Sequence, residues 1–435
     1  MSSRTSSRLT RLGAVAVTTV LAYASLAVPG AQGATRAGAG AGTGAGARCL
    51  DTSAAVTVEG RRLERPAPRE ILDRSGFDRA RPAFVRDLCA ARSLPAAKRA
   101  VDRHAKALWK GAVERARDPR GGDDRPLYWA RLSLDTALRQ WKPGFPVSDR
   151  ERDALLARLE RGSRGQDSVA FPAGKKVKRI LVTGFDPFTL DRDTRIGNPS
   201  GAAALALDGT TVRTESGPAR IETVVFPVRW RDFAEGTVEK TLLPHFTSGP
   251  RRIDMFTTIS QGRPGQFDVE RFNGAWRGGF ADNENASSTG TVPIPDGIPS
   301  PAPQPQWTVT SLPYGALAGS GTGRFPVVDH TEVTEIPKGG TEPVVRENGP
   351  TPGSQAREGG GGDYLSNEIA YRATLLRDAL RLDVPGGHLH TPVLDFGKGN
   401  TDEITDPDFE RNRRDITAQT RTLVVKAAGT LKPQG

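Results

Sequence analysis

The chain has 435 residues, which is enough for two domains with buried cores. Its formal net charge is +11, and the basic excess is concentrated at residues 51–165, where 26 Lys and Arg are mixed with 17 Asp and Glu. Because the charges are interspersed and lack interleaved aromatic residues, the pattern argues against a nucleic-acid partner. It favours a solvated helical surface, which could contact an anionic cell envelope.

The first 33 residues have the three parts of a secretory signal peptide. A basic, Ser-rich start, MSSRTSSRLTRLG, precedes the apolar run AVAVTTVLAYASLAV, and Ala31-Gln32-Gly33 offers a cleavage site. A membrane anchor is the alternative, but the apolar run is short for a span of about 20 residues. We therefore expect a secreted protein with a signal peptide at 1–33 and a flexible Gly/Ala-rich linker at 34–48.

The chain contains two cysteines, Cys49 and Cys89. In an exported protein an even pair predicts one disulfide, here at the start of the first domain. Two free buried thiols are the alternative. Both cysteines lie far upstream of the candidate catalytic residues, so neither is expected to act as a nucleophile.

Residues 49–165 are predicted to form a helical accessory domain. In LPAAKRAVDRHAKALWKGAVERAR apolar residues recur at helical intervals, and DRERDALLARLERG starts with acidic residues and ends at a glycine. His104 lies within the first of these helices, where a surface or core role is favoured over metal binding. This region contains no catalytic combination of residues.

Residues 175–432 are predicted to form an α/β domain with a mostly parallel sheet. KRILVTGF, RRIDMFTTIS and GGHLHTPVLDF have the character of strands, whereas RWRDFAEGTVEKTLLPHF and DITAQTRTLVVKAAGTL have that of helices. Strands that alternate with helices indicate this fold class. Two Pro/Gly-rich stretches, 290–306 and 337–362, are predicted to be loops or insertions.

Ser366, in GGDYLSNEIAY, is a candidate nucleophile. A run of glycines precedes it, and a helical pattern starts near Asn367, so the hydroxyl is expected at a helix N-terminus that favours a developing oxyanion. The local sequence alone favours a simpler alternative, because Ser is a favoured N-cap residue.

His390 and Glu270 are the candidate partners of Ser366. His390 follows an alternating apolar stretch at a predicted strand end, where the active crevices of parallel sheets lie. His388 shares its strand face, which suggests a metal site, but no third His or Cys lies near in the sequence. Glu270 could orient the histidine, or it could be an exposed loop charge.

Seven short motifs in this order resemble the pyroglutamyl peptidase I family, also called pyrrolidone carboxyl peptidase. They are ILVTGFDPF with NPSGAAALALDG, FPV at 226–228, GRPGQFDVER, ADN at 281–283, TSLP at 310–313, GGDYLSNEIAY and HLHTP. Each motif is short, and the similarity covers roughly 177–430. The resemblance implies an open α/β/α sandwich.

The resemblance also implies a catalytic triad, carried over to Glu270, Ser366 and His390. Ser366 stands where the family has a catalytic cysteine. Phe185, Phe188 and Asn198 would bind the substrate, and the two phenylalanines would line its pocket. Backbone amides at 184–188 and at Ser366 would stabilise the oxyanion.

Two functions follow as hypotheses. The first is an exported hydrolase that removes an N-terminal pyroglutamyl or similar residue from a peptide substrate, without a metal or another cofactor. The second is an inactive relative that binds peptides or cell-envelope material. A hydroxyl needs a general base during attack, which a Glu–His pair can provide. The sequence leaves the oligomeric state open.

Overall fold

The computed structural model describes residues 49–118, 121–174 and 176–432. The predicted signal peptide and linker lie outside the described residues. None of the helices in the described part of the chain combines the length and apolar character that a membrane span requires.

The first part of the described chain is helical. The helices are α1 (Val58–Arg61), α2 (Pro66–Ser75), α3 (Ala80–Cys89), α4 (Leu94–Ala116), α5 (Arg125–Gln140) and α6 (Asp149–Ser163). Side-chain oxygens cap three of them at their N-termini, those of Thr57 for α1, Ser93 for α4 and Ser148 for α6. A disulfide joins Cys49 to Cys89, with 5.8 Å between their Cα atoms.

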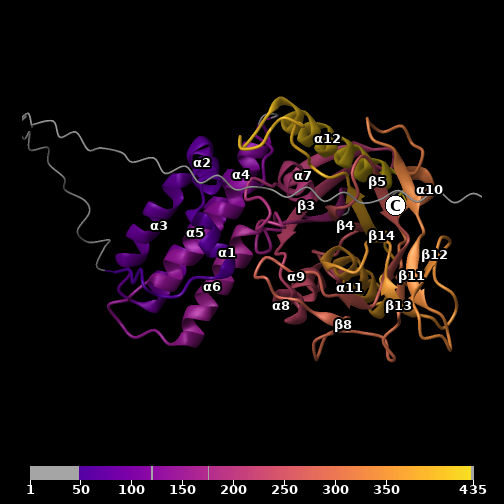
Figure 1. The fold of residues 1–435 in the computed structure, drawn as a ribbon, viewed down its shortest axis with the longest axis horizontal. Coiled ribbons are helices and arrows are strands. Elements are labelled where there is room, and N and C mark those ends of the chain that lie inside the picture. Colours follow the sequence, from indigo (N-terminus) through magenta and orange to yellow (C-terminus); the bar gives the residue numbers. More distant parts are fainter. Residues whose placement is uncertain (1–48, 119–120, 175, 433–435) are drawn as a thin grey trace, which may run out of the picture. The chain divides into compact units, whose positions relative to one another are not determined.

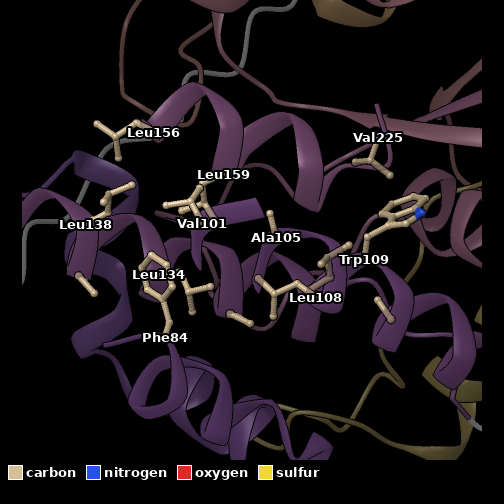
Figure 2. Packing of buried hydrophobic residues seen from close by; sticks show 14 of the residues in the cluster. Phe84, Val101, Ala105, Leu108, Trp109, Leu134, Leu138, Leu156, Leu159 and Val225 are labelled. Carbon is tan, nitrogen blue, oxygen red and sulfur yellow. The ribbon is translucent and has the colours of Figure 1, made fainter. Parts of the chain in front are cut away.

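The apolar faces of these helices share one core. Val101, Ala105 and Leu108 recur on one side of α4 and face the side chains of α5 and α6 (Figure 2). The same core reaches Val225 in the sheet through Trp109. The helices are therefore packed onto the α/β part of the chain.

The α/β part is built on a seven-stranded sheet with the order β10-β5-β14-β4-β1-β3-β2. The strands are β1 (Lys178–Phe185), β2 (Thr210–Thr214), β3 (Gly217–Phe226), β4 (Met255–Gln261), β5 (Phe267–Glu270), β10 (Val327–His330) and β14 (Gly386–Thr391). Neighbouring strands pair in parallel except at β14–β5 and β2–β3. The predicted α/β fold with a mostly parallel sheet, preceded by helices, is confirmed.

Helices cover both faces of the sheet (Figure 1). On one face, α7 (Pro199–Leu207), α10 (Tyr314–Leu317) and α12 (Pro407–Gly429) pack on the strands. On the other face lie α8 (Trp230–Ala234), α9 (Thr237–Phe246) and α11 (Leu365–Ala379). Ile180 and Leu181 show the alternation in β1, because they belong to the cores on opposite faces.

Buried ion pairs connect the helical part to the sheet. Asp186, which follows β1, accepts a hydrogen bond from Arg164 after α6 and forms an ion pair with Arg131 of α5, each at 2.6 Å. Arg229 contacts Glu59 of α1 at 3.0 Å. All five side chains are at least nine-tenths buried, so these contacts place ion pairs in the interior between the helical part and the sheet.

Part of the predicted insertion at 337–362 is a small sheet rather than a loop. Strands β12 (Val344–Arg346) and β13 (Gln355–Glu358) pair with β11 (Val333–Ile336) in an antiparallel arrangement. Two further ribbons are formed by β6 (Phe272–Gly274) with β9 (Trp307–Val309), and by β7 (Trp276–Gly278) with β8 (Thr289–Thr291). The first sheet leads directly into the glycine run before α11.

Candidate active site

Three neighbouring strands bring the predicted Glu270 and His390 together. Glu270 is the last residue of β5, and the strand register places it beside His330 of β10 and opposite His388 of β14. His390 lies two residues beyond His388, on the same strand face. Glu270 is completely buried, so the alternative of an exposed loop charge is wrong.

Each carboxylate oxygen of Glu270 contacts a different histidine. Oε1 lies 2.7 Å from Nδ1 of His390, and Oε2 lies 2.6 Å from Nδ1 of His330. Burial alone would raise the pKa of Glu270, but the hydrogen bonds and charges of His330 and His390 outweigh it and lower the pKa to about 2. An ionised carboxylate only accepts, so both Nδ1 atoms carry a hydrogen.

His388 supports the site from inside the sheet. Its Nδ1 lies 2.8 Å from Oγ1 of Thr258, and its Nε2 lies 2.8 Å from Oγ of Ser260. Burial lowers the pKa of His388 well below its ordinary value, and the nearby His390 adds to the effect. The ring is therefore neutral and has both nitrogens engaged, and it packs edge-on against His390 at 4.7 Å between centroids.

Ser366 lies in the first turn of α11, as the helical pattern predicted, but it does not cap the helix. The N-cap residue is Tyr364, and Ser366 Oγ donates a hydrogen bond to the carbonyl oxygen of Gly361 at 2.9 Å. The next residue, Asn367, fixes the start of α11, because its side chain bonds both the N–H and the carbonyl of Gly274 at 2.8 Å. The N-cap interpretation of Ser366 is therefore wrong.

A cavity of about 380 Å³ brings Ser366 and His390 onto a shared surface. His330 also lines the cavity, as does the glycine run 359–362. Within the described ranges no hydrogen bond joins Ser366 to His390, because the hydroxyl bonds Gly361 instead. A rotation of the Ser366 side chain would be needed before His390 could accept its proton.

The predicted substrate-binding residues do not line this cavity. Phe185 is buried in the core on the α11 side of the sheet, stacked on Phe233. Phe188 is partly buried against Tyr364, at 6.4 Å between ring centroids. Asn198 caps α7 by accepting from the N–H of Ser200. A substrate-binding role for these three residues stays a prediction.

The backbone at 184–188 offers few free donors. The amide of Phe185 donates to Ser200 Oγ at 3.1 Å, and the amide of Asp186 donates to the carbonyl of Phe226 at 3.0 Å. Pro187 has no N–H group. Among residues 185–188, the predicted oxyanion contact therefore depends on the N–H of Phe188.

One group of side chains near the cavity has the composition of a metal site. Ligand-type atoms of Asp268, Glu270 and His390 lie within 4.8 Å of one another, so these residues could hold a metal ion. Both oxygens of Glu270 already contact imidazole nitrogens, and Asp268 pairs with Arg263 at 3.4 Å. A cation here would have to displace these groups.

His330 is the residue that sequence reasoning missed. It is the last residue of β10, after Val327, Val328 and Asp329, just as His390 lies next to the last residue of β14. The same argument that singled out His390, a histidine at a strand end, would have identified it. Its position between two irregular Pro/Gly-containing stretches concealed the strand.

The fold and site thus define an α/β protein with a serine, two histidines and one shared buried carboxylate at a sheet edge. Two family models match the chain: the PA0049 N-terminal domain over residues 39–160, and the PA0049 C-terminal domain over 179–310 and 322–395. The chain is 34% identical to the uncharacterized protein PA0049 of Pseudomonas aeruginosa, over 87% of this chain and 90% of that protein. It belongs to the PA0049 family.

Solved structures with similarity to the chain include two peptidases. Pyroglutamyl peptidase I of Bacillus amyloliquefaciens aligns with 18% identity and a TM-score of 0.39, covering 59% of this chain and all of that one. Pyrrolidone carboxyl peptidase of Thermococcus litoralis aligns with 16% identity and a TM-score of 0.37, covering 60% of this chain and 99% of that one.

Proposed function

We propose that the protein is a serine hydrolase that removes an N-terminal pyroglutamyl, or similar lactam-bearing, residue from peptides. The observation that carries the proposal is the 2.7 Å contact between Glu270 and His390, with Ser366 on the same cavity as His390. The substrate class rests on the seven sequence motifs and not on the geometry of the cavity.

The chemistry follows from the tautomer of His390. Because Nδ1–H faces Glu270, Nε2 is the nitrogen that can accept a proton. Ser366 Oγ would attack the carbonyl carbon while its proton passes to Nε2, and Glu270 would stabilise the imidazolium that forms. The same imidazolium would then protonate the leaving amine. Water would release the acyl group from Ser366 by the reverse sequence of proton transfers.

The test uses a fluorogenic pyroglutamyl amide together with a fluorophosphonate probe. We expect turnover by the purified protein and labelling at Ser366, both lost in Ser366→Ala. Ser287→Ala is the matched control, because Ser287 is exposed and lies outside the cavity. If neither turnover nor labelling is seen, the hydrolase proposal is wrong.

A second candidate is an inactive relative that binds peptides, and the hydrogen bond from Ser366 to Gly361 favours it. In that case calorimetry would detect binding of a pyroglutamyl peptide without turnover. Activity that appears only in Ser366→Cys would identify a thiol enzyme that has lost its nucleophile. The thiolate is intrinsically the stronger nucleophile, so this variant separates a lost nucleophile from a lost site.

Export is part of the proposal. The signal-peptide pattern at 1–33 supports secretion, and the basic residues of 51–165 support contact with an anionic cell envelope. The mature N-terminus, determined by mass spectrometry on protein recovered outside the cytoplasm, should begin close to residue 34. An intact N-terminus on protein confined to the cytoplasm would contradict export.

A further inference from the structure

The carboxylate of Glu270 is divided between two histidines. His390 holds Oε1 and His330 holds Oε2, at nearly equal distances of 2.7 and 2.6 Å. His330 lines the same cavity as Ser366, and its Nε2 is buried without a hydrogen-bond partner among the described residues. The ring of His330 is therefore held in place through Nδ1 and Glu270.

The charges around His330 come from the strands β5, β10 and β14 and from the segment before β5. Glu270 and Asp268 lie on the neighbouring strand β5, Arg263 lies in the segment before it, and Asp329 precedes His330 on β10 itself. His390 of β14 lies across the shared carboxylate. Two further acidic residues, Glu332 and Glu358, line the cavity.

This environment favours the protonated form of His330. Burial alone would lower the pKa of His330, but the hydrogen bond and charge of Glu270 outweigh it and raise the pKa above its ordinary value. Arg263 opposes this effect and Asp268 adds to it. His330 therefore keeps its proton to a higher pH than a free histidine does.

We propose that His330 is a positioning residue of the serine site, and that its charge decides how much of the Glu270 carboxylate is available to His390. The inference rests on the proposed function. In the attack, His390 takes the Ser366 proton and becomes an imidazolium. If His330 is also protonated, two imidazolium groups share one negative charge, and the transition state is less stabilised. Loss of the Nε2 proton of His330 removes this competing positive charge, while its Nδ1–H still donates to Oε2.

The pH dependence of the reaction rate shows how many protons must leave the site before Ser366 reacts. Below both ionisations, a plot of the logarithm of the rate against pH approaches a slope of two when two coupled groups must lose protons, and one when a single group must. We expect a slope of two for the full chain and of one for His330→Gln, which keeps an N–H donor for Oε2. The measured rate is that of Ser366 labelling by the fluorophosphonate.

His104→Gln is the matched control. His104 also contacts a carboxylate, Asp87 at 3.0 Å, but it lies in α4 and outside the site. For His104→Gln, the slope of the logarithm of the labelling rate against pH should stay at two. Equal slopes for the full chain and His330→Gln would overturn the proposal, and His330→Asn repeats the test if His330→Gln does not fold.

A second measurement does not require activity. The chain has five histidines, so proton NMR titration of their ring signals can be assigned by single substitutions. The midpoint of His330 should lie above the ordinary value of about 6.5 and fall in Glu270→Gln, because the hydrogen bond and charge of Glu270 raise it. An unchanged midpoint in Glu270→Gln would overturn the proposal. If this shift is seen but Ser366 is never labelled, the hydrolase proposal fails and the sharing of Glu270 stands.

Discussion

Gly360 lies directly against Glu270: a Cβ atom added to Gly360 would stand 2.1 Å from Oε2. Gly262 has the same relationship to His390, since its added Cβ would stand 2.6 Å from Cβ and Cγ of that histidine. Two glycines thus lie against the Glu270–His390 pair. Because they have no side chains, the backbone at both positions packs directly on the two catalytic candidates.

The substitution Gly360→Ala should therefore disable the site. The methyl group would push Oε2 away from His330 and turn the carboxylate that orients His390. We expect labelling of Ser366 to slow by about a hundredfold, the effect of a misplacement of about 1 Å, with a stability loss of about 1–3 kcal/mol from overpacking.

Gly399→Ala provides the comparison for this experiment. An added Cβ at Gly399 meets nothing within 4 Å, so labelling and thermal stability should stay unchanged. Equal labelling rates for the two variants would show that the packing of Gly360 on Glu270 has no catalytic consequence.

Arg372 should be essential for the stability of the α11 region. It is completely buried and lies 2.7 Å from Glu368 of its own helix and 2.7 Å from Glu239 of α9. Arg372→Met leaves Glu239 without its cationic partner, and the free energy of unfolding should fall by about 3–5 kcal/mol. Urea denaturation measures this change.

The exposed pair Arg411–Asp408 tests whether burial is the reason why the loss of Arg372 lowers the free energy of unfolding. Both side chains are about half exposed, so Arg411→Met should change the free energy of unfolding by less than about 1 kcal/mol. A loss in Arg372→Met as small as that in Arg411→Met would contradict the argument.

Asp124 should make the folded state less stable as the pH rises. Burial, followed by the charge of Asp123, raises the pKa of Asp124 from 3.8 to about 8, and Oδ1 has no hydrogen-bond partner in the described part of the chain. Between about pH 4 and pH 8 the native state then binds more protons than the unfolded state. The contribution of Asp124 is therefore present at low pH and is lost as the pH rises through about 8.

In the folded chain, Asp124 Oδ2 accepts a hydrogen bond from the backbone N–H of Asn198 at 2.8 Å. Asp124→Asn removes the titration of the carboxyl group and keeps an oxygen that can accept this hydrogen bond. Unfolding in urea at several pH values should show a smaller decline for the variant than for the native chain. A difference between the two proteins that does not change from pH 4 to pH 8 would disprove the assignment.

Sequence reasoning worked best where an apolar pattern and a chemical group coincide. KRILVTGF is the strand Lys178–Phe185, and His390 lies in a strand next to Glu270, because buried parallel strands leave a continuous apolar run and place polar groups at their ends. The start of α11 was predicted within two residues from its apolar spacing.

The remaining features depend on contacts between distant segments. His330 follows only three residues of a short edge strand, and it is recognisable as part of the site only once β10 pairs with β5. The strands β12 and β13 were missed because Pro and Gly suggest loops, while their antiparallel pairing with β11 determines the structure. Ser366 suits an N-cap by residue type, yet Tyr364 occupies that position.

The disulfide should stabilise the helical part without taking part in the chemistry. Cys49 and Cys89 are 40 residues apart in the sequence, and closing a loop of this size contributes about 4 kcal/mol in the chain-entropy model. The double variant Cys49→Ser/Cys89→Ser should lose up to this amount in urea denaturation. At low temperature without denaturant, Ser366 should still be labelled at the native rate, because the described residues contain no free cysteine and the cavity is lined by other residues. Loss of labelling in a double variant that is still folded by circular dichroism would show that the disulfide controls the site.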